Sequence, residues 1–359
     1  MKNKVLYVIP SLEMGGAELL LVNWLNKFDG SKYNWEVHLM VIGSNARMLP
    51  SISNKKVIIH HIKAIKKNYI FKLPKIFLLM YKINPHIIHS HLYKANILVR
   101  FFKIFNKKVK VINHYHGLSL WIGKFKLFTD KYTQFLIDKA LVVSDKSFYV
   151  RRKRERICTK KLQIFYNFCN QKKIPTNVKN TKKKLTLSMA CRLIKLKNIP
   201  KVINFVSYLN KQNISAQLLI AGEGPEEESI RAIIKKKKLE DSIKLLGFKN
   251  DLSQFYKDTH VYIIASDTED LPMSMIEAMS YGCHIISSDV GGIKQVLDKC
   301  EGLVVPEITK EYYQKIKVYL NSIDIKKASR INSNLVEKEF LVNNYLKKTL
   351  NLYTELISK

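Results

Sequence analysis

The regular alternation of short apolar runs with longer helical segments limits what this chain can fold into. The runs have the length of buried strands and contain many β-branched residues, whereas the segments between them are amphipathic or rich in lysine. Such alternation favours an α/β fold with parallel, doubly wound sheets. The predicted strands are Lys4–Ile9, Val37–Ile42, Val57–Ile62, His86–His89, Lys110–Asn113, Ala140–Ser144 and Leu162–Tyr166, followed by Leu185–Ala190, Gln217–Gly222, Ile243–Gly247, Val261–Ser266, His284–Asp289 and Gly302–Val305.

One polar segment interrupts the alternation and predicts two domains. Asn170–Lys184 contains Pro175 and has no apolar periodicity, which is typical of a linker. The expected parts are an N-terminal Rossmann-like domain at 1–170, a linker at 171–184, and a C-terminal Rossmann-like domain at 185–359 that ends in a helix, Tyr345–Ile357. Ligands of such sheets bind beyond the carboxyl ends of the strands, so we expect a site in a cleft that the two domains face.

Charge distinguishes the two halves of the chain. Residues 1–175 contain 33 basic and 8 acidic side chains, whereas residues 176–359 contain 29 and 21. No acidic residue occurs from Val37 to Thr129. This asymmetry favours a large anionic partner for the first half. The alternative is a lysine-rich genome, but such a bias would raise the lysine content of both halves.

Cysteine usage and hydropathy predict a cytoplasmic protein. The five cysteines form no CxxC pair, which argues against a disulfide framework or structural zinc. No apolar stretch reaches the ~18 residues of a membrane-spanning helix. The first residues have neither a long apolar run nor a small-residue cleavage site, so we expect no secretory signal.

The segment 266–282 carries the strongest indication of chemistry. A predicted strand runs into a polar loop, Pro272 lies near a helix start, and Gly282 marks the helix end. Backbone N–H groups at such a start attract phosphate oxygens. Glu277, in the first turns, has two acceptor oxygens that suit the vicinal diol of a ribose, and Glu269 would point into the same pocket. The alternative is that Glu277 is simply an exposed helix acid.

Two further segments follow predicted strands of the second half. Arg192 and Lys197 lie five residues apart in a loop that leads into a helix, where two cations can clamp a diphosphate. Chance basic pairs are frequent in a chain with 62 basic residues. The segment AGEGP, 221–225, places glycines where backbone can approach a ligand closely, although such turns are common in α/β proteins.

Taken in order, these motifs resemble family-4 retaining glycosyltransferases of the bacterial surface-polysaccharide and lipopolysaccharide type, which have the GT-B fold. The resemblance is specific over 185–297 and looser before residue 170. In the second half it comprises Arg192 to Lys197, AGEGP, LLGFKND (245–251), EDLPMSMIEAMSYG (269–282) and SSDVGGIKQVL (287–297), with Glu269 and Glu277 in E-x7-E spacing. In the first half it comprises PSLEMGGAE (10–18), HSHLYKANILVR (89–100), HYHG (114–117) and FYNF (165–168).

The resemblance implies a donor site for a nucleotide-sugar. In it Glu277 would bind the ribose, Arg192 and Lys197 the diphosphate, and Glu269 with the backbone of 270–273 the transferred sugar and its phosphate. The implied donor-binding residues are Gly15, Gly16, Arg192, Lys197, Glu269, Leu271, Pro272, Met273 and Glu277. Family members usually have glycine where this chain has Cys191 and Asp270, which puts the local sugar contacts in doubt.

The resemblance also implies a mechanism. The catalytic residues would be His116, Glu269, Arg192 and Lys197, and His91 and His116 would lie on the acceptor side. Attack would come from the front face with retention, and cations with helix N–H groups would stabilise the leaving diphosphate. GT-B transferases generally need no metal, and no carboxylate or cysteine accompanies the histidines, so neither metal nor cofactor is expected.

Three basic segments of the first half predict a membrane surface as partner. Tyr69–Ile83 and Ile97–Lys110 mix lysines with large apolar residues, and Arg151–Arg154 adds a third cluster. Pro74 is expected to begin a helix in the first segment. Basic amphipathic segments lie in membrane interfaces and are attracted to anionic lipid. We therefore expect a peripheral protein on the inner face of the cell membrane, whose acceptor is a lipid-linked or capsule-type surface glycan.

Two alternatives remain at this point. An epimerase of nucleotide-sugars or a sugar phosphorylase would have the same fold, and fold does not determine reaction type. A nucleic-acid-binding protein, a different class, is suggested by the isoelectric point of about 9.8. No helix-turn-helix, zinc-finger or RNP-type motif accompanies that charge, so no specific nucleic acid is expected.

Overall fold

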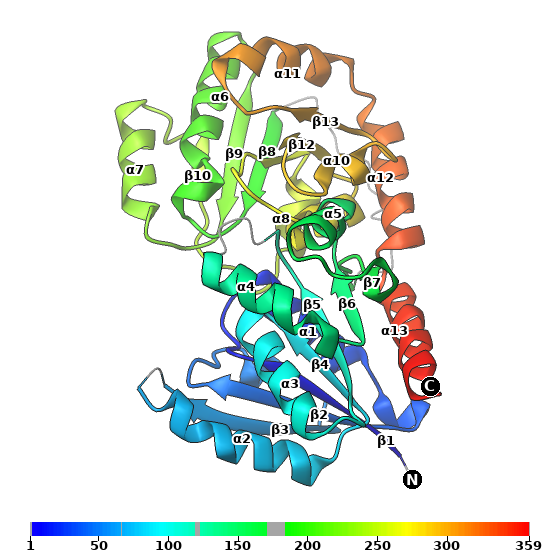
Figure 1. Cartoon of the computed structure of the whole chain (residues 1–359). Coiled ribbons are helices and arrows are strands. Elements are labelled where there is room, and N and C mark those ends of the chain that lie inside the picture. The colour runs from blue at the N-terminus through cyan, green and yellow to red at the C-terminus, as the bar shows by residue number, and fades with distance from the viewer. Residues whose placement is uncertain (1, 66, 119–122, 171–183, 359) are drawn as a thin grey trace. The chain divides into compact units, whose positions relative to one another are not determined.

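The computed structural model describes residues 2–65, 67–118, 123–170 and 184–358 of the chain. These residues fall into two compact units (Figure 1). Unit 1 comprises Met1–Phe168 together with Val342–Lys359, and unit 2 comprises Cys169–Leu341. The predicted linker, 171–184, lies outside the described residues except for Lys184.

Unit 1 is built on a parallel sheet in the order β3-β2-β1-β4-β5-β6-β7. Its main elements are β1 (Asn3–Ile9), α1 (Gly16–Lys27), β2 (Trp35–Gly43), β3 (Val57–Ala64), α2 (Tyr69–Ile83), β4 (Ile87–His91), α3 (Tyr93–Phe105), β5 (Lys110–Tyr115), α4 (Lys124–Thr133), β6 (Lys139–Val142), α5 (Asp145–Arg154), β7 (Leu162–Ile164) and α13 (Val342–Ile357). Helices α2 and α3 bury their apolar sides on one face of the sheet, against residues such as Leu6, Val8 and Ile88.

The last helix, α13, packs on the opposite face of the same sheet. The Tyr353 hydroxyl lies 2.8 Å from the Tyr7 hydroxyl and 2.8 Å from Nδ1 of His89. About two turns earlier in the helix, the ring of Tyr345 meets those of Trp24 and Phe168. The division therefore differs from the expected one: the terminal helix belongs to unit 1, because its aromatic side complements the polar and aromatic residues at the centre of that sheet.

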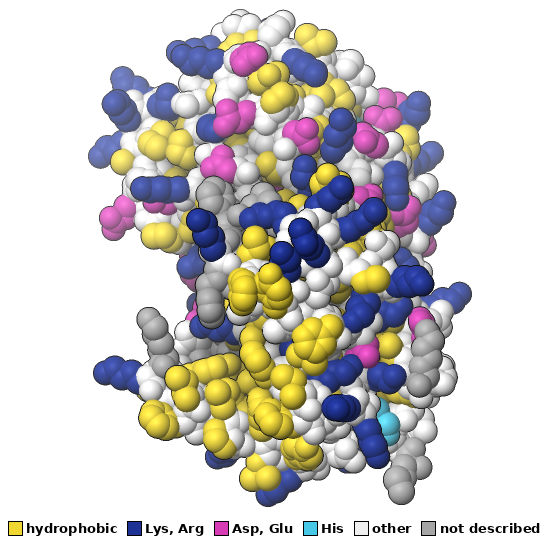
Figure 2. Space-filling model, viewed as in Figure 1, with side chains coloured by type: hydrophobic (Ala, Val, Ile, Leu, Met, Phe, Trp, Pro, Cys, Tyr) yellow, Lys and Arg dark blue, Asp and Glu magenta, His cyan; other side chains and the backbone are white. Residues whose placement is uncertain are grey.

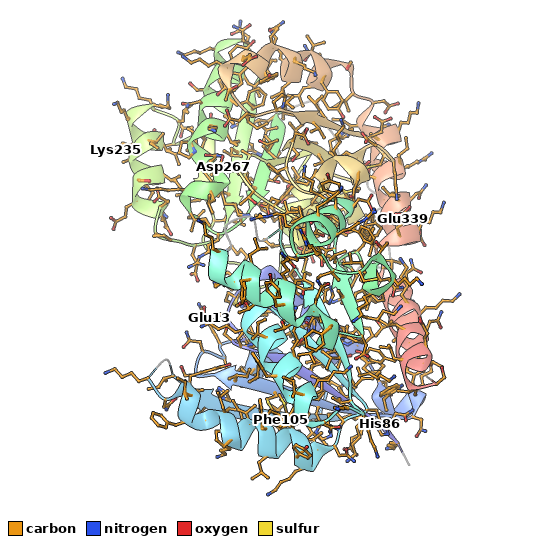
Figure 3. All side chains as sticks on the ribbon, viewed as in Figure 1. Glu13, His86, Phe105, Lys235, Asp267 and Glu339 are labelled. Carbon is orange, nitrogen blue, oxygen red and sulfur yellow. The ribbon has the colours of Figure 1, made fainter. Side chains whose placement is uncertain are left out.

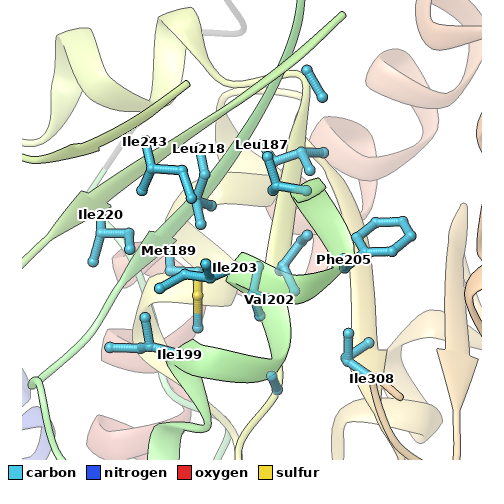
Figure 4. Packing of buried hydrophobic residues seen from close by; sticks show 14 of the residues in the cluster. Leu187, Met189, Ile199, Val202, Ile203, Phe205, Leu218, Ile220, Ile243 and Ile308 are labelled. Carbon is cyan, nitrogen blue, oxygen red and sulfur yellow. The ribbon is translucent and has the colours of Figure 1, made fainter. Parts of the chain in front are cut away.

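Unit 2 repeats the architecture with the order β10-β9-β8-β11-β12-β13, again parallel. Its main elements are β8 (Leu185–Ala190), η5 (Lys195–Lys197), α6 (Ile199–Lys211), β9 (Ala216–Ala221), α7 (Glu227–Lys236), β10 (Ile243–Leu245), α8 (Ser253–Asp258), β11 (Val261–Ile264), α9 (Met273–Ser280), β12 (His284–Ser288), α10 (Ile293–Leu297), β13 (Gly302–Val305), α11 (Lys310–Ser322) and α12 (Ile325–Glu339). Figure 4 shows the apolar side of α6 packed on β8 and β9.

The predicted fold class and strands are confirmed. Each predicted strand is present, with ends that shift by at most two residues. The position of Pro74 was predicted wrongly, because α2 begins five residues earlier, at Tyr69. The helix continues through the proline because Ile76, Met80 and Ile83 bury its apolar side, which compensates for one missing backbone hydrogen bond.

Strand order places a ligand site on each sheet. In unit 2, β8 lies between β9 and β11, and in unit 1, β1 lies between β2 and β4. The strand order reverses at these points, so the loops after the two central strands diverge in opposite directions and leave a crevice at the carboxyl ends. Some of the motifs named above lie at these strands. The segment from Arg192 to Lys197 follows β8 and EDLPMSMIEAMSYG follows β11, whereas PSLEMGGAE follows β1 and HSHLYKANILVR begins in β4.

Candidate functional site

The loop after β8, which carries Arg192, is held by the loop after β9. The N–H of Leu193 donates to the carbonyl of Glu223, and the N–H of Glu226 donates to the carbonyl of Leu193. A Cβ on Gly222 would lie 1.9 Å from the carbonyl oxygen of Cys191, and one on Gly224 would lie 2.3 Å from that of Leu193. The AGEGP glycines were expected to let backbone approach a ligand, but in this structure they leave room for the carbonyls of the loop after β8. Arg192, in that loop, is exposed.

The loop after β11 carries Glu269, which pairs with Lys197 of η5. The Lys197 ammonium and Glu269 Oε1 form an ion pair, and the Ser266 hydroxyl donates to the same oxygen at 2.8 Å. The side-chain amide of Asn198 also donates to the carbonyl of Ala265 at 2.9 Å. Both charged side chains are mostly shielded from solvent. The structure thus brings two predicted catalytic residues together, at the point where the strand order of the sheet reverses.

Asp270, where the resemblance expects glycine, lies in the same loop after β11. The residue is buried, and its φ is not positive. Its carbonyl accepts from the N–H of Gly292 at 2.7 Å, which ties the loop after β11 to the loop after β12. Gly291 has φ +60°, and a Cβ there would lie 2.4 Å from the carbonyl oxygens of both Glu269 and Asp270. Glycine is therefore required at this position.

Replacing Gly291 with alanine is expected to destabilise the protein and displace Glu269. A left-handed backbone costs a side chain about 1–2 kcal/mol, and the contact with two carbonyl oxygens adds to that. Thermal unfolding followed by circular dichroism measures the effect. The matched control is Gly247→Ala, where φ is +65° but a Cβ meets nothing within 4 Å. Equal losses in the two variants would mean that the close approach at Gly291 is unimportant.

Glu277 lies on α9, and one of its two carboxylate oxygens accepts a hydrogen bond from a side chain. The Tyr256 hydroxyl donates to its Oε2 at 2.9 Å. Burial raises the pKa of the Glu277 carboxyl, and the hydrogen bond from Tyr256 partly offsets that rise. No side chain caps the helix, which starts after Pro272. The N–H groups of Met275 and Ile276 donate to the carbonyl of Pro272. The two N–H groups before them have no acceptor within the helix and can donate to an anion.

Cys191 precedes Arg192 in the position where the resemblance expects glycine. Burial is the main reason that the pKa of its thiol rises to about 11. The thiol is therefore protonated at neutral pH and acts as a small apolar side chain. Its carbonyl faces Gly222, as described above, so the local packing depends on the backbone at this position.

The predicted residues of unit 1 lie at the carboxyl ends of its central strands. Gly15 and Gly16 end the loop after β1, and α1 begins at Gly16. A Cβ on Gly15 would lie 2.3 Å from the Glu18 carboxylate, whereas one on Gly16 would meet nothing within 4 Å. His91 ends β4, and His116 follows β5 directly.

His91 and His116 belong to a larger histidine cluster. Nδ1 of His91 lies 2.8 Å from Nε2 of His116, and the rings of His89 and His114 stack against them. Burial lowers the pKa of His116 and of His89 to about 3, and lowers the pKa of His91 and of His114 well below the ordinary value. All four rings are therefore neutral at pH 7. His91 is buried in the free protein, and its place on the acceptor side stays a prediction.

Sequence reasoning assigned no role to several residues that shape these sites. Tyr256 and Ser266 hold the two key carboxylates, and Tyr353 holds His89. Their partners are 21, 3 and 264 residues away in sequence. Only Ser266, within the conspicuous 266–282 segment, carried a signal. The predicted donor residues from Arg192 to Glu277 lie together in unit 2, whereas Gly15, Gly16, His91 and His116 lie in unit 1.

Comparison with known proteins finds a family model that resembles most of unit 2. Residues 170–334 match the family model described as Glycosyl transferases group 1. The GtfA subunit of the UDP-N-acetylglucosamine–peptide N-acetylglucosaminyltransferase of Streptococcus agalactiae is 32% identical over 189 residues, which cover 48% of this chain and 37% of that protein. The chain thus spans well under two thirds of this relative's length.

Other similarities extend over more of the chain. The capsular polysaccharide biosynthesis glycosyltransferase CapH of Staphylococcus aureus is 22% identical over 300 residues, which cover 80% of this chain and 81% of CapH. Among solved structures, Alr3699/HepE of Anabaena in complex with UDP covers 99% of this chain and 100% of its own, with a TM-score of 0.81 and 15% identity. At that identity the likeness concerns the fold.

Proposed function

We propose that this protein is a retaining hexosyltransferase, because residues 170–334 match the model of group 1 glycosyl transferases and the chain has the GT-B fold. It moves a hexose or an N-acetylhexosamine from a UDP-sugar to a lipid-linked or cell-surface glycan. The names of two relatives, a UDP-N-acetylglucosamine transferase and a capsule glycosyltransferase, support this choice of donor and acceptor.

One observation carries the proposal. The Lys197–Glu269 ion pair lies where the strand order of the unit 2 sheet reverses. Arg192 is exposed on the loop after β8. Helix α9, whose start no side chain caps, follows the loop after β11 that carries Glu269. An ammonium group, a guanidinium group and a helix start together suit a diphosphate, and the carboxylate of Glu277 suits a ribose. An epimerase or phosphorylase would share this donor site, and the relatives' names support transfer instead.

The residues supply electrostatic stabilisation in the proposed reaction. The bond between the anomeric carbon and the diphosphate oxygen breaks, and the acceptor hydroxyl oxygen bonds to that carbon on the same face. The hydroxyl proton passes to the leaving diphosphate, so the products are the glycoside and UDP. Arg192 and Lys197 stabilise the charge that develops on the diphosphate, which requires no metal at this site. His116 keeps in this scheme the catalytic role that the resemblance implies for it.

Calorimetric titration without added metal tests the proposal. UDP should bind with one site per chain, and GDP and ADP should bind more weakly. Sugar transfer from UDP-hexoses and UDP-N-acetylhexosamines to lipid-linked acceptors is measured next. Failure of all three nucleotides to bind would overturn the donor site. Tight UDP binding with hydrolysis or epimerisation but no transfer would overturn the reaction type.

We further propose that unit 1 binds a membrane through one face, which we call the apolar-basic face. Figure 2 shows hydrophobic side chains gathered over α2, α3 and α4, with lysines and arginines around them. The exposed large apolar residues of these three helices are Ile70, Phe71, Leu78, Tyr81, Phe101, Ile104, Phe105, Phe128 and Tyr132. The Tyr81 hydroxyl donates to the Phe105 carbonyl at 2.8 Å, so α2 and the end of α3 lie side by side (Figure 3).

An anionic bilayer suits this face better than a protein surface does. Exposed lysines such as Lys75, Lys82 and Lys108 border the aromatic residues, and no acidic residue occurs over 37–129. Each lysine near anionic lipid contributes about 1 kcal/mol, and aromatic rings favour the membrane interface. The predicted Arg151–Arg154 cluster contributes less than expected, because Arg151 is buried against Glu155. No helix in the described ranges has the length and hydropathy to cross a bilayer.

The double substitution Phe71→Ser with Phe105→Ser is expected to weaken vesicle binding about tenfold or more, because each ring loses its burial in the interface. Phe71 is 83% exposed and Phe105 is 65% exposed, so the variant should fold normally. Co-sedimentation with phosphatidylglycerol-containing vesicles measures binding. Val318→Ser, an exposed apolar residue of unit 2, is the control. No preference for anionic over neutral vesicles in the wild type would refute the membrane partner.

A further inference from the structure

The histidine cluster of unit 1 contains ring nitrogens that the described residues leave without partners. These atoms are Nε2 of His89, Nε2 of His91 and both ring nitrogens of His114, and all of them are buried. A buried polar atom without a hydrogen bond costs about 1–3 kcal/mol. A cluster of such atoms therefore indicates a ligand that binds nitrogen, either a metal ion that takes the lone pairs or a polar group that forms hydrogen bonds.

Strand register brings these nitrogens together. His91 of β4 pairs with His114 of β5, and His89 lies two residues before His91 and so on the same face of the sheet. One ring nitrogen from each of the three residues lies within 4.8 Å of the others. Three nitrogens bound to Zn²⁺ at about 2.0–2.1 Å lie about 3.3 Å apart in a tetrahedral site. The rings therefore need to close by only about 1.5 Å.

The opposite ring nitrogens already have fixed partners. Nδ1 of His89 lies 2.8 Å from the Tyr353 hydroxyl, and Nδ1 of His91 lies 2.8 Å from Nε2 of His116. When Nδ1 of each ring donates to these acceptors, the lone pair of Nε2, which has no partner among the described residues, is available to a ligand. Histidines that bind metals are typically oriented in this way, with the second nitrogen donating to a neighbouring group.

We propose that His89, His91 and His114 bind one divalent transition-metal ion of the zinc class. A donor set of imidazoles alone favours Zn²⁺, Co²⁺, Ni²⁺ or Cu²⁺ over Mg²⁺ or Ca²⁺. The prediction that the chain holds no metal assumed that a carboxylate or cysteine ligand was necessary. Three imidazoles with one water complete a tetrahedral site.

None of the three proposed ligands is Arg192, Lys197, Glu269 or Glu277 of unit 2, and the ion takes no part in the bond changes proposed above for sugar transfer. Its effect is to join the ends of β4 and β5 and to orient His91, which in turn holds His116. His91 is then a positioning residue for His116, a role that its burial also favours.

Cobalt titration tests the site directly. Tag-free protein, freed of metal with a chelator, is titrated with Co²⁺ while the visible absorption of tetrahedral cobalt is recorded. We expect saturation at one ion per chain and loss of the band when Zn²⁺ is added. His114→Phe, which keeps an aromatic ring in the stack, should lower the cobalt affinity about a hundredfold or more. His89→Gln should have a similar effect.

A matched control separates this cluster from the other histidines. His60→Phe removes the pair in which Nε2 of His60 lies 3.0 Å from Nδ1 of His38, on β3 and β2. This variant should bind cobalt as the wild type does. Absence of the visible band, or a band that survives both His114→Phe and His89→Gln, overturns the proposal. Loss of the band in His60→Phe alone would place the metal at the other pair and would also overturn it.

Discussion

Replacing Arg192 with alanine is expected to lower kcat for sugar transfer about 10²–10³-fold, while UDP affinity falls less than about tenfold. The guanidinium group is exposed in the free protein, so its removal leaves no buried partner without a hydrogen bond. Negative charge on the diphosphate grows as the sugar departs. An interaction that strengthens in the transition state acts mainly on kcat.

Steady-state kinetics and calorimetry measure the two quantities separately. The matched control is Lys195→Ala, which removes an exposed cation from the same loop, three residues along the chain. If both variants lose activity equally, the general positive charge of the loop matters rather than the position of Arg192. A wild-type kcat in Arg192→Ala would remove this residue from the catalytic assignment.

Glu277→Ala is expected to weaken UDP binding about 10–100-fold, because a charge-assisted hydrogen bond to a ribose hydroxyl contributes about 1.5–3 kcal/mol. Tyr256→Phe keeps the carboxylate and removes only the 2.9 Å hydrogen bond to Oε2, so its effect should be smaller. Glu228→Gln, an exposed position of α7, is the control and should bind UDP normally. Unchanged UDP affinity in Glu277→Ala would refute the ribose contact.

The raised pKa of Glu277 adds a dependence on pH. Its carboxyl takes up a proton at a higher pH than an exposed glutamate does, because burial disfavours the charged form. A protonated carboxyl is a poorer acceptor, so UDP affinity should fall as the pH is lowered. Glu277→Gln cannot titrate, and its affinity, already reduced, should lose that component of the pH dependence.

The motif of the donor loop could be predicted because it is local. Glu269 and Glu277 are eight residues apart, and the strand, the loop, Pro272 and the following helix occur in sequence order. The Lys197–Glu269 ion pair could be expected only in outline. Lys197 and Glu269 are 72 positions apart, and they meet only because β8 and β11 are neighbours in the sheet.

Other expectations failed for reasons of packing. Gly222 and Gly224 were expected to face a ligand, yet the carbonyls of Cys191 and Leu193 occupy that space. The terminal helix was expected to close the second domain because it follows it in the chain. Tyr353 instead completes the polar contacts of Tyr7 and His89 in the first sheet.

The amino-acid sequence by itself determined the two parallel α/β units, their strands and the composition of the donor loop. Those features depend on alternating apolar runs, turn residues and short spacings, which act between neighbours in the chain. Only the tertiary structure decided which sheet α13 covers, what the AGEGP glycines contact, and that His89, His91 and His114 converge. These depend on contacts between segments tens to hundreds of residues apart, which periodicity and spacing do not encode.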